Sequence, residues 1–257
     1  MSKDVWNVEQ YEKFKLQRKE PFYDLLKRVV RRPNLTVVDL GCGTGELTAE
    51  LHQQLDCRST IGIDSSPSML GKANHIDIDG LRFELQDINS WRASQEYDLV
   101  FSNAALQWVP SHREILQSIF LSLRTGGQVA IQIPKNDTNP SQKVGFQLES
   151  ETPFSDYPPN PIRPNTLNPD DYAEMLWRLG FKDIQVEMKV YLHELPSSSE
   201  VVEWVGGTFL TYYEGAYPKD VFDRFLLLYS ERLLGELQDT SPILFTFNRI
   251  LLSAMKP

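Results

Sequence analysis

The sequence has 257 residues, of which 41% are hydrophobic and 24% charged, and a formal net charge of −9 at pH 7. These values are typical of a globular protein with one large or two small domains. A negatively charged surface repels a phosphate backbone, so we expect no nucleic-acid partner. No apolar run approaches the length that a bilayer requires, and residues 1–4 lack the apolar core of a signal peptide. We therefore expect a cytoplasmic protein that has no membrane partner.

The cysteines and histidines indicate neither a disulfide framework nor a metal site. Cys42 lies inside a glycine-rich turn and Cys57 in a loop, and the two form no metal-binding spacing. The four histidines are scattered along the chain at His52, His75, His112 and His193. We therefore predict that the protein binds no metal.

The first half of the chain alternates between strands and helices. Residues 6–30 have the apolar spacing of a helix, which Pro21 is expected to break or restart. Further helices are predicted after the glycine-rich turn to about residue 55, at 68–74 and at 112–123, and strands at 36–40, 60–64, 81–85, 97–102 and 128–133. Thr125-Gly126-Gly127 is expected to stop the last of these helices and turn into the fifth strand. This alternation predicts parallel strands joined by right-handed crossovers, a doubly wound α/β sheet with its ligand at the carboxyl ends of the strands.

The second half of the chain begins with a change of composition. Residues 134–169 contain eight prolines and little periodicity, so we expect a long loop there. Asn168 is expected to cap a helix that ends at Leu179-Gly180, and a strand is predicted at 183–191. Two or three helices rich in aromatic residues follow over 197–237, and 243–255 is predicted as the last strand.

A glycine-rich stretch marks the turn from the first strand into the first helix of the sheet. Asp39 lies near the end of the strand, and Gly41, Gly43 and Gly45 follow at alternate positions. Glycines let a ligand approach the backbone, and the helix N-terminus offers free N–H groups. The dinucleotide fingerprint requires a glycine at position 46, where Glu46 would repel a pyrophosphate. The stretch therefore disfavours NAD or FAD, and a tight turn without a ligand remains the alternative.

Two carboxylates follow the next two strands. Asp64 ends the second strand, where it would accept hydrogen bonds from both ribose hydroxyls of a nucleoside; a helix cap is the alternative. Asp87 follows the third strand and would accept from an adenine amino group, while the Ile88 N–H donates to the ring. A plain turn aspartate is the other interpretation of Asp87.

The segment after the fourth strand, residues 102–110, combines small residues with polar ones. Asn103 begins it, and alanines at 104 and 105 allow close approach to a ligand. Gln107 and Trp108 would direct a donor and an amphipathic ring toward the same crevice. For Trp108, packing under the following helix is the alternative.

The glycine stretch and the acidic end of the second strand together resemble the first motifs of class I S-adenosylmethionine-dependent methyltransferases. Within that class, a wider set resembles the trans-aconitate 2-methyltransferases along nearly the whole chain. The set comprises Trp6-Asn7 with Tyr11, residues 39–45, residues 62–67, Asp87-Ile88 with Trp91, residues 103–108, Leu195-Pro196-Ser197 and Trp204-Val205.

This resemblance implies S-adenosyl-L-methionine as cofactor, S-adenosyl-L-homocysteine as product and methyl transfer to a carboxylate of a small organic acid. It also implies that Tyr11 and Arg18, in an N-terminal helical lid, contact the methionine end of the cofactor, with packing against the sheet edge as the alternative for both residues. The other cofactor-binding residues are assigned as Asp39, Gly41, Gly43, Gly45, Asp64, Ser65, Asp87, Ile88 and Asn103, and the catalytic residues as Gln107 and Trp108.

The expected fold is a seven-stranded, mostly parallel Rossmann-like methyltransferase sheet with a helical cap inserted before the last strand. We predict a single domain, 1–257, consisting of the lid at 1–30, the cofactor-binding core at 31–134, and a substrate loop, cap and last strands at 135–257. The protein is expected to be a monomer or a weak homodimer.

The acceptor is less clearly defined than the cofactor. Residues 206–213 contain no arginine, and Tyr212 and Tyr213 favour a more apolar acid unless both belong to the core. A carboxylate with a pKa of about 4 is ionised at pH 7 and needs no general base, so positioning is the main task expected of the site. Methylation of another small molecule or of a carrier-bound malonyl group, and a non-catalytic nucleoside-binding scaffold, remain as alternatives.

Overall fold

The structure is a computed structural model of the chain and describes residues 15–161, 165–237 and 241–257. Two compact units are formed. The sheet unit comprises Arg18–Pro134, Pro164–Lys189 and Arg249–Pro257, and the helical unit comprises Met1–Gln17, Lys135–Arg163 and Val190–Asn248. The predicted boundary after residue 134 coincides with one boundary between these units. The division into lid, core and cap remains a prediction.

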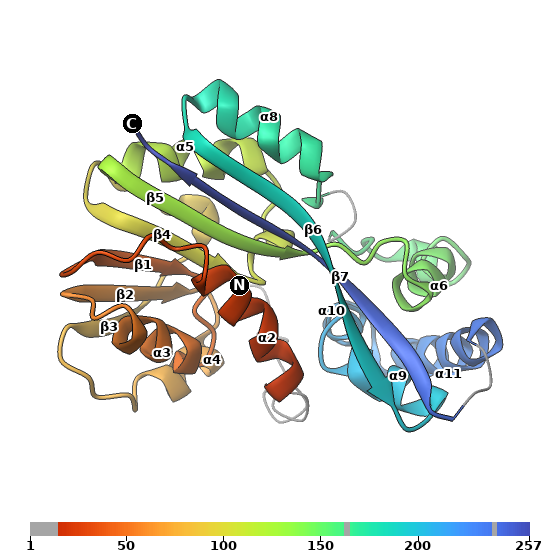
Figure 1. The fold of residues 1–257 in the computed structure, drawn as a ribbon. Coiled ribbons are helices and arrows are strands. Elements are labelled where there is room, and N and C mark those ends of the chain that lie inside the picture. Colours follow the sequence, from red (N-terminus) through yellow and green to blue (C-terminus); the bar gives the residue numbers. More distant parts are fainter. Residues whose placement is uncertain (1–14, 162–164, 238–240) are drawn as a thin grey trace. The chain divides into compact units, whose positions relative to one another are not determined.

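A seven-stranded sheet carries the fold, in the order β3-β2-β1-β4-β5-β7-β6 (Figure 1). Strands β1 to β5 pair in parallel, and β7 pairs antiparallel with β5. This confirms the predicted doubly wound, mostly parallel sheet. The strands are β1 Thr36–Leu40, β2 Ser59–Asp64, β3 Leu81–Leu85, β4 Tyr97–Asn103, β5 Leu123–Pro134, β6 Lys182–Leu195 and β7 Ile243–Met255.

Helices of the sheet unit cover both faces of the sheet (Figure 1). One face packs on α2 (Lys15–Leu26) and α3 (Glu46–Gln54) through a buried cluster that includes Phe22, Leu51 and Phe101. The opposite face packs on α5 (His112–Ser122) and α8 (Pro169–Leu179) through a second cluster. Two short 3-10 helices, η1 (Ile88–Ser90) and η2 (Leu106–Trp108), and the helix α4 (Pro67–Ala73) follow strands β3, β4 and β2. Because the helices bury both faces, the carboxyl ends of the strands are where a ligand can approach.

Pro21 does not break its helix, so that prediction was wrong. Helix α2 runs through Pro21 from Lys15 to Leu26. A proline inside a helix removes one backbone hydrogen bond. Here Phe22 is completely buried and meets Phe101 edge-on with ring centroids 5.6 Å apart, and Leu25 is completely buried as well. We attribute the unbroken helix to this packing, which offsets the lost hydrogen bond.

Strand β5 begins earlier than predicted, at Leu123. The expected turn at 125–127 lies inside the strand, where the register with β4 shifts between Tyr97 and Leu99. Gly126 keeps a left-handed φ of 74°, and its N–H donates to the Lys256 carbonyl at 2.9 Å. The glycine therefore forms an irregularity within a strand rather than a separate turn.

The predicted long loop at 134–169 contains a helix, so this expectation was wrong too. Helix α6 (Pro140–Leu148) starts at Asn139, whose side chain accepts from the Ser141 N–H at 3.1 Å. Pro140 occupies the first helical position, where its missing N–H costs nothing. The prolines that indicated a loop thus include one that starts a helix.

The helical unit also contains α9 (Ser198–Gly206), α10 (Thr211–Ala216) and α11 (Lys219–Glu236), which lie between β6 and β7 in the chain as the predicted cap does. Its interior is aromatic. A Cβ atom on Gly145 of α6 would lie 2.4 Å from the Phe209 ring, and the Tyr229 hydroxyl donates to the Ser141 carbonyl at 2.7 Å. Tyr213 is completely buried, so it belongs to this core, one of the two interpretations that the sequence left open.

Candidate functional site

The glycine-rich turn follows β1 and has the backbone conformation that only glycine adopts readily. Gly41, Gly43 and Gly45 have φ values of 83°, 56° and 78°. A Cβ atom on Gly41 would lie 2.2 Å from the Cβ of Ala105, so this glycine allows the loop after β4 to approach. A Cβ atom on Gly43 would meet no described atom within 4 Å. The backbone at Gly43 is therefore open to a ligand, whereas that at Gly41 is covered.

Asp64 joins the end of β2 to the glycine turn. Its Oδ2 accepts from the Gly43 N–H and its Oδ1 from the Ser66 N–H, both at 2.9 Å. The cap of α4 is Ser66, whose side chain accepts from the Met69 N–H. Asp64 is therefore not that helix cap, which removes the alternative interpretation. Each carboxylate oxygen can accept more than one hydrogen bond, and Asp64 is only half-buried, so it can still accept from a ligand.

Asp87 and Ile88 lie beside this turn with different constraints. Asp87 caps η1, and its Oδ1 accepts from both the backbone and side-chain nitrogens of Asn89 at 2.8 Å. This is the turn aspartate that the sequence left as an alternative, although its exposed side chain leaves a ligand contact possible. The Ile88 side chain lies 3.6 Å from the Cβ position of Gly41, so η1 packs on the glycine turn. Both residues, like the exposed Ser65, remain predicted cofactor residues.

The loop after β4 is held by its own hydrogen bonds. Ala104 has a left-handed φ of 55°, and its N–H donates to the Gln132 carbonyl at 3.0 Å. Gln107 donates from Nε2 to the Ala104 carbonyl at 2.7 Å and accepts at its backbone carbonyl from Asn165 Nδ2 at 3.2 Å. Gln107 is only 6% exposed. Its hydrogen bonds therefore stabilise the loop, whereas the sequence predicted that its side chain would extend from the loop toward a ligand. The catalytic assignments of Gln107 and of the half-buried Trp108 remain predictions.

His112 begins α5 directly behind this loop and is 3% exposed. Its Nε2 lies 2.7 Å from the Leu106 carbonyl, which can only accept, so Nε2 carries the proton. Its Nδ1 then accepts from the Tyr172 hydroxyl at 2.6 Å. Burial lowers the pKa of His112 below its usual value of 6.5, although its backbone hydrogen bonds oppose this. A neutral ring with both nitrogens engaged supports the loop and is poorly placed to act as a base.

Asp39 is the most deeply buried of the predicted site carboxylates. It is 5% exposed, and its Oδ2 accepts from the Thr48 hydroxyl at 2.6 Å. Its Oδ1 is buried and has no hydrogen-bond partner within the described part of the chain. Burial raises the pKa of Asp39 to about 7; the Thr48 hydrogen bond opposes this, and the charge of Asp64 adds to it. A cationic ligand nearby would favour its ionised form.

Sequence reasoning missed one polar residue of this region, Gln132 on β5. It is 1% exposed and lies opposite Asn103 in the parallel register of β4 and β5. The signal was a single amide within the apolar run Val129-Ala130-Ile131-Gln132-Ile133. Of the predicted residues, Tyr11 and the side chain of Arg18 lie outside the described residues.

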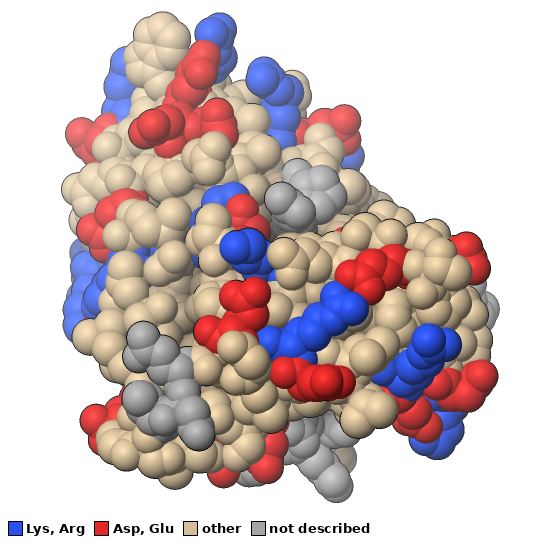
Figure 2. All heavy atoms as spheres, turned by 90° about the vertical axis from the view of Figure 1, so that its right-hand side faces the viewer, with Lys and Arg blue, Asp and Glu red and all other residues tan. Residues whose placement is uncertain are grey.

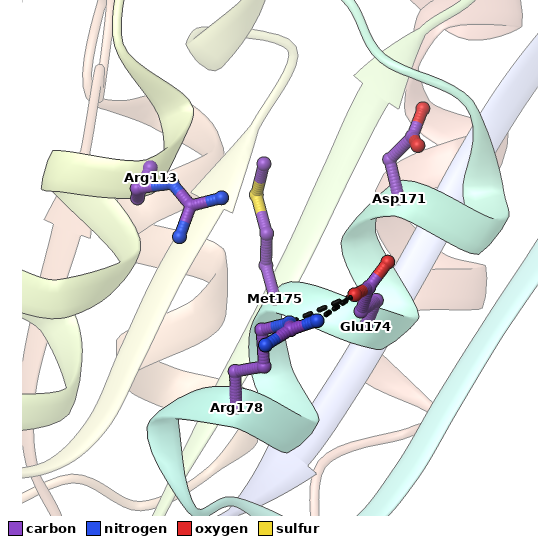
Figure 3. Close-up of a pocket in the computed structure, with 5 residues that line it drawn as sticks. All are labelled: Arg113, Asp171, Glu174, Met175 and Arg178. Atoms are coloured by element: carbon purple, nitrogen blue, oxygen red, sulfur yellow. Dashed lines mark hydrogen bonds and ion pairs between the residues drawn. The ribbon is translucent and has the colours of Figure 1, made fainter.

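A surface pocket of about 230 Å³ lies between α5 and α8 and contains none of the predicted site residues (Figure 3). It is lined by Arg113, Asp171, Glu174, Met175 and Arg178. Figure 3 shows Met175 between Arg113 and α8, while Arg178 forms an ion pair with Glu174 at 2.6 Å. Since none of the predicted site residues lines this pocket, it is not the candidate site.

The face of the molecule that Figure 2 draws carries charges of both signs. On the face drawn in Figure 2, lysine and arginine side chains are interspersed with aspartate and glutamate over the described residues. None of the helices in the described ranges is long and apolar enough to cross a membrane. Within those ranges, no three histidine, cysteine or acidic residues are grouped as metal ligands.

The chain is similar in sequence to several known proteins. A family model described as a methyltransferase domain matches residues 31–154. A trans-aconitate 2-methyltransferase of Deinococcus radiodurans is 38% identical over 258 residues, which cover 98% of this chain and 99% of that protein.

Solved structures also resemble the fold. The YcgJ protein of Bacillus subtilis matches with a TM-score of 0.63 at 14% identity, over 92% of this chain and 98% of that one. Phosphoethanolamine N-methyltransferase 2 of Haemonchus contortus, solved with S-adenosyl-L-methionine, matches with a TM-score of 0.59 at 18% identity, over 93% of this chain and 52% of that one.

Proposed function

This chain belongs to the trans-aconitate 2-methyltransferase family, and from that premise we propose that it methylates a carboxylate of a small organic acid. It is an S-adenosylmethionine-dependent methyltransferase, and the products would be a monomethyl ester and S-adenosyl-L-homocysteine. The observation that carries the proposal is the junction of Asp64, the open Gly43 backbone and the loop after β4. At one edge of the sheet there are thus a carboxylate that can accept from the ribose hydroxyls, a backbone that a ligand can reach, and the loop at 103–108 that is predicted to position the methyl acceptor.

The described residues fit the cofactor. Asp64 would accept from the ribose hydroxyls, since its half-buried carboxylate ends β2 beside the glycine turn and a carboxylate oxygen can accept more than one hydrogen bond. The unpartnered Oδ1 atoms of Asp39 and Asn103 supply buried acceptors for an ammonium group. Acceptors and a negative charge suit a ligand that carries two positive centres, an ammonium and a sulfonium.

The acceptor is proposed to be a carboxylate because His112, the histidine next to the loop after β4, is not available as a base for a group that must first lose a proton. When bound, S-adenosylmethionine supplies an electrophilic methyl group. His112 is buried and hydrogen-bonded through both nitrogens, so it would not take a proton from the acceptor. A carboxylate is ionised at neutral pH and attacks without such help.

The main task of the protein is then to position the attacking oxygen next to the methyl group. The loop at 103–108 is fixed by the bonds of Ala104 and Gln107, and it lies against Gly41. A fixed loop can hold the attacking oxygen near the methyl group and keep water away, which accounts for a large part of the rate of such displacements. Neutral donors suit this task because a strong cation would reduce the nucleophilicity of the carboxylate.

Turnover with a panel of carboxylic acids tests the proposal. We expect S-adenosylhomocysteine to form with small di- or tricarboxylic acids, trans-aconitate included, and not with their fully esterified forms. The matched esters keep the carbon skeleton of the acid and remove the nucleophile. Binding of S-adenosylmethionine without turnover on any acid would contradict the proposal and favour a nucleoside-binding scaffold or a different acceptor.

A further inference from the structure

Three neighbouring strands carry a polar side chain within their last three residues, on the same face of the sheet. Asp39 on β1 lies opposite Phe101 on β4, and Asn103 lies opposite Gln132 on β5. Residues two apart on a strand share a face, so Phe101 and Asn103 point the same way. Asp39, Asn103 and Gln132 therefore form a polar row at the carboxyl ends of the strands, on the face that packs against α2 and α3.

Each member of this row has a buried atom to which the described residues offer no hydrogen bond. The atoms are Oδ1 of Asp39, Oδ1 of Asn103 and Nε2 of Gln132. Gln132 is the extreme case, because its side chain is 1% exposed and the unpartnered atom is a donor. Buried donors nearly always have a partner in folded proteins. An amide donor left open at the ligand end of a sheet indicates a partner that comes from the ligand.

A second glutamine on the same strand provides the contrast. Gln128 lies four residues earlier on β5 and so on the same face, and it is 4% exposed. Its Nε2 donates to the Val30 carbonyl and its Oε1 accepts from the Val30 N–H, both at 2.9 Å. Burial of a glutamine on this face thus does not by itself leave the amide unpartnered. Gln132 differs in lying at the end of the strand where ligands bind.

We propose that Gln132 is a ligand-binding residue of the transfer site and donates from Nε2 to a ligand carboxylate. This deepens the proposed function and rests on it. The carboxylate has two sources, the methionine end of the cofactor or the acceptor acid. The neighbouring acceptors on Asp39 and Asn103 suit an ammonium group beside a carboxylate, which is the pair that an amino-acid end carries. A neutral amide donor would orient an acceptor carboxylate as well, without suppressing its reactivity.

The test compares Gln132→Leu with Gln128→Leu in the full chain. Calorimetry measures the affinity for S-adenosylhomocysteine and for 5′-methylthioadenosine, which keeps the nucleoside and sulfur but lacks the amino-acid end. If the cofactor is the source, Gln132→Leu weakens S-adenosylhomocysteine binding about tenfold or more and leaves 5′-methylthioadenosine binding unchanged. If the acceptor is the source, S-adenosylhomocysteine binding is unchanged and KM for the acid rises by a similar factor. Both quantities within twofold of wild type would overturn the proposal.

Stability separates a ligand-binding role from a structural one. Without ligand, Gln132→Leu is expected to melt at the wild-type temperature or above, because it removes an unpartnered polar atom. Gln128→Leu is expected to melt lower, since it breaks two bonds to Val30, and to leave both affinities unchanged. Gln132→Glu keeps the shape and replaces the donor with an anion, so it tests the assignment even where the leucine variant fails to fold. We expect it to weaken carboxylate binding more than leucine does, and wild-type affinity would contradict the assignment.

The binding measurements need no turnover. A wild-type protein that binds S-adenosylhomocysteine but methylates no acid would refute the proposed acceptor. Calorimetry would then still decide whether Gln132 binds the carboxylate of the cofactor. Conversely, normal turnover on an acid together with an unaffected Gln132→Leu variant would refute only the role of Gln132.

Discussion

The strand ends of the sheet unit and the interior of the helical unit differ in how far the oxygens of their carboxyl groups are hydrogen-bonded. In the helical unit, Glu149 Oε2 accepts from the Tyr213 hydroxyl and from the Asn160 N–H, both at 2.9 Å. At the strand ends, Asp39 satisfies one oxygen with Thr48, and the other has no hydrogen bond from the residues described. A buried polar atom left unpartnered costs about 1–3 kcal/mol of stability.

The helical unit is not free of such atoms, since Gln142 Oε1 and Tyr217 OH are also unpartnered within the described chain. What distinguishes the sheet unit is that three of its unpartnered atoms, on Asp39, Asn103 and Gln132, come from neighbouring strands at one edge of the sheet. We infer that a row of buried atoms without hydrogen-bond partners indicates the ligand-binding site, whereas a single such atom does not. In the helical unit, by contrast, polar atoms such as the Tyr213 hydroxyl are hydrogen-bonded within an aromatic core.

The largest expected effect comes from glycines that are crowded in each unit. Gly41→Ala would place a Cβ atom 2.2 Å from Ala105 Cβ at a φ of 83°, so the loop after β4 must move. We expect cofactor affinity to fall by about a hundredfold or more, together with a loss of stability of about 1–3 kcal/mol. Gly145→Ala, with its Cβ 2.4 Å from the Phe209 ring, should cost similar stability and leave cofactor affinity unchanged. Titration calorimetry and denaturant unfolding measure the two quantities, and equal cofactor losses in both variants would break the comparison.

A smaller effect is expected at the carboxylate that holds the turn. Asp64→Ala removes the acceptor of the Gly43 N–H and the proposed acceptor of the ribose hydroxyls. We expect S-adenosylmethionine binding to weaken by about 2 kcal/mol, or about thirtyfold, with the fold retained. Asp87→Ala serves as the control, because its exposed side chain is already bonded to Asn89, and it should lose less. Unchanged affinity in Asp64→Ala would remove the ribose assignment.

The sequence predicted the sheet well and the helical unit less well, for physical reasons. Strands β1, β3 and β7 match their predicted ranges because their apolar residues stand out in the sequence between turn residues. Helix α6 was missed because prolines mark both loops and helix starts, and only the packing of Gly145 on Phe209 distinguishes the two.

Some parts of the candidate site could likewise be predicted from the sequence, and others could not. The glycine turn and Asp64 could be predicted because their spacing along the chain is itself the signal. Partnerships between distant residues could not be predicted. Tyr213 and Glu149 are 64 positions apart, and nothing in the composition of β5 distinguishes the satisfied Gln128 from the open Gln132. Whether a buried polar atom has a partner is decided by tertiary structure.

The pH dependence of the ligand-free protein should report Asp39. Its pKa is raised to about 7, mainly by burial, from 3.8, so the folded state holds a proton that the unfolded state releases. Stability from this residue is therefore complete below about pH 4 and declines as the pH rises toward 7. A cationic cofactor favours the ionised form, so its affinity should increase across about pH 6 to 8. Asp39→Asn should flatten both trends, measured by urea unfolding and by titration at several pH values. An unchanged slope in the variant would show that another group titrates.

The smallest expected effect on chemistry is at His112, and it separates support of the loop from proton transfer. The variant His112→Gln loses at least one of the bonds to the Leu106 carbonyl and the Tyr172 hydroxyl, so we expect it to lose about 1–3 kcal/mol of stability. Its pH profile of kcat should keep the wild-type shape between about pH 6 and 8, because an ionised carboxylate acceptor needs no base. Gln107→Ala is the matched comparison, since it removes the bond to the Ala104 carbonyl and should lower kcat/KM by roughly tenfold to a hundredfold without changing that profile. If His112→Gln instead abolished turnover while S-adenosylmethionine still bound and the protein stayed folded, the histidine would be moving a proton. The methyl acceptor would then be a hydroxyl or an amine. The unpartnered hydrogen-bonding atoms at the strand ends would have to be reinterpreted for a neutral substrate.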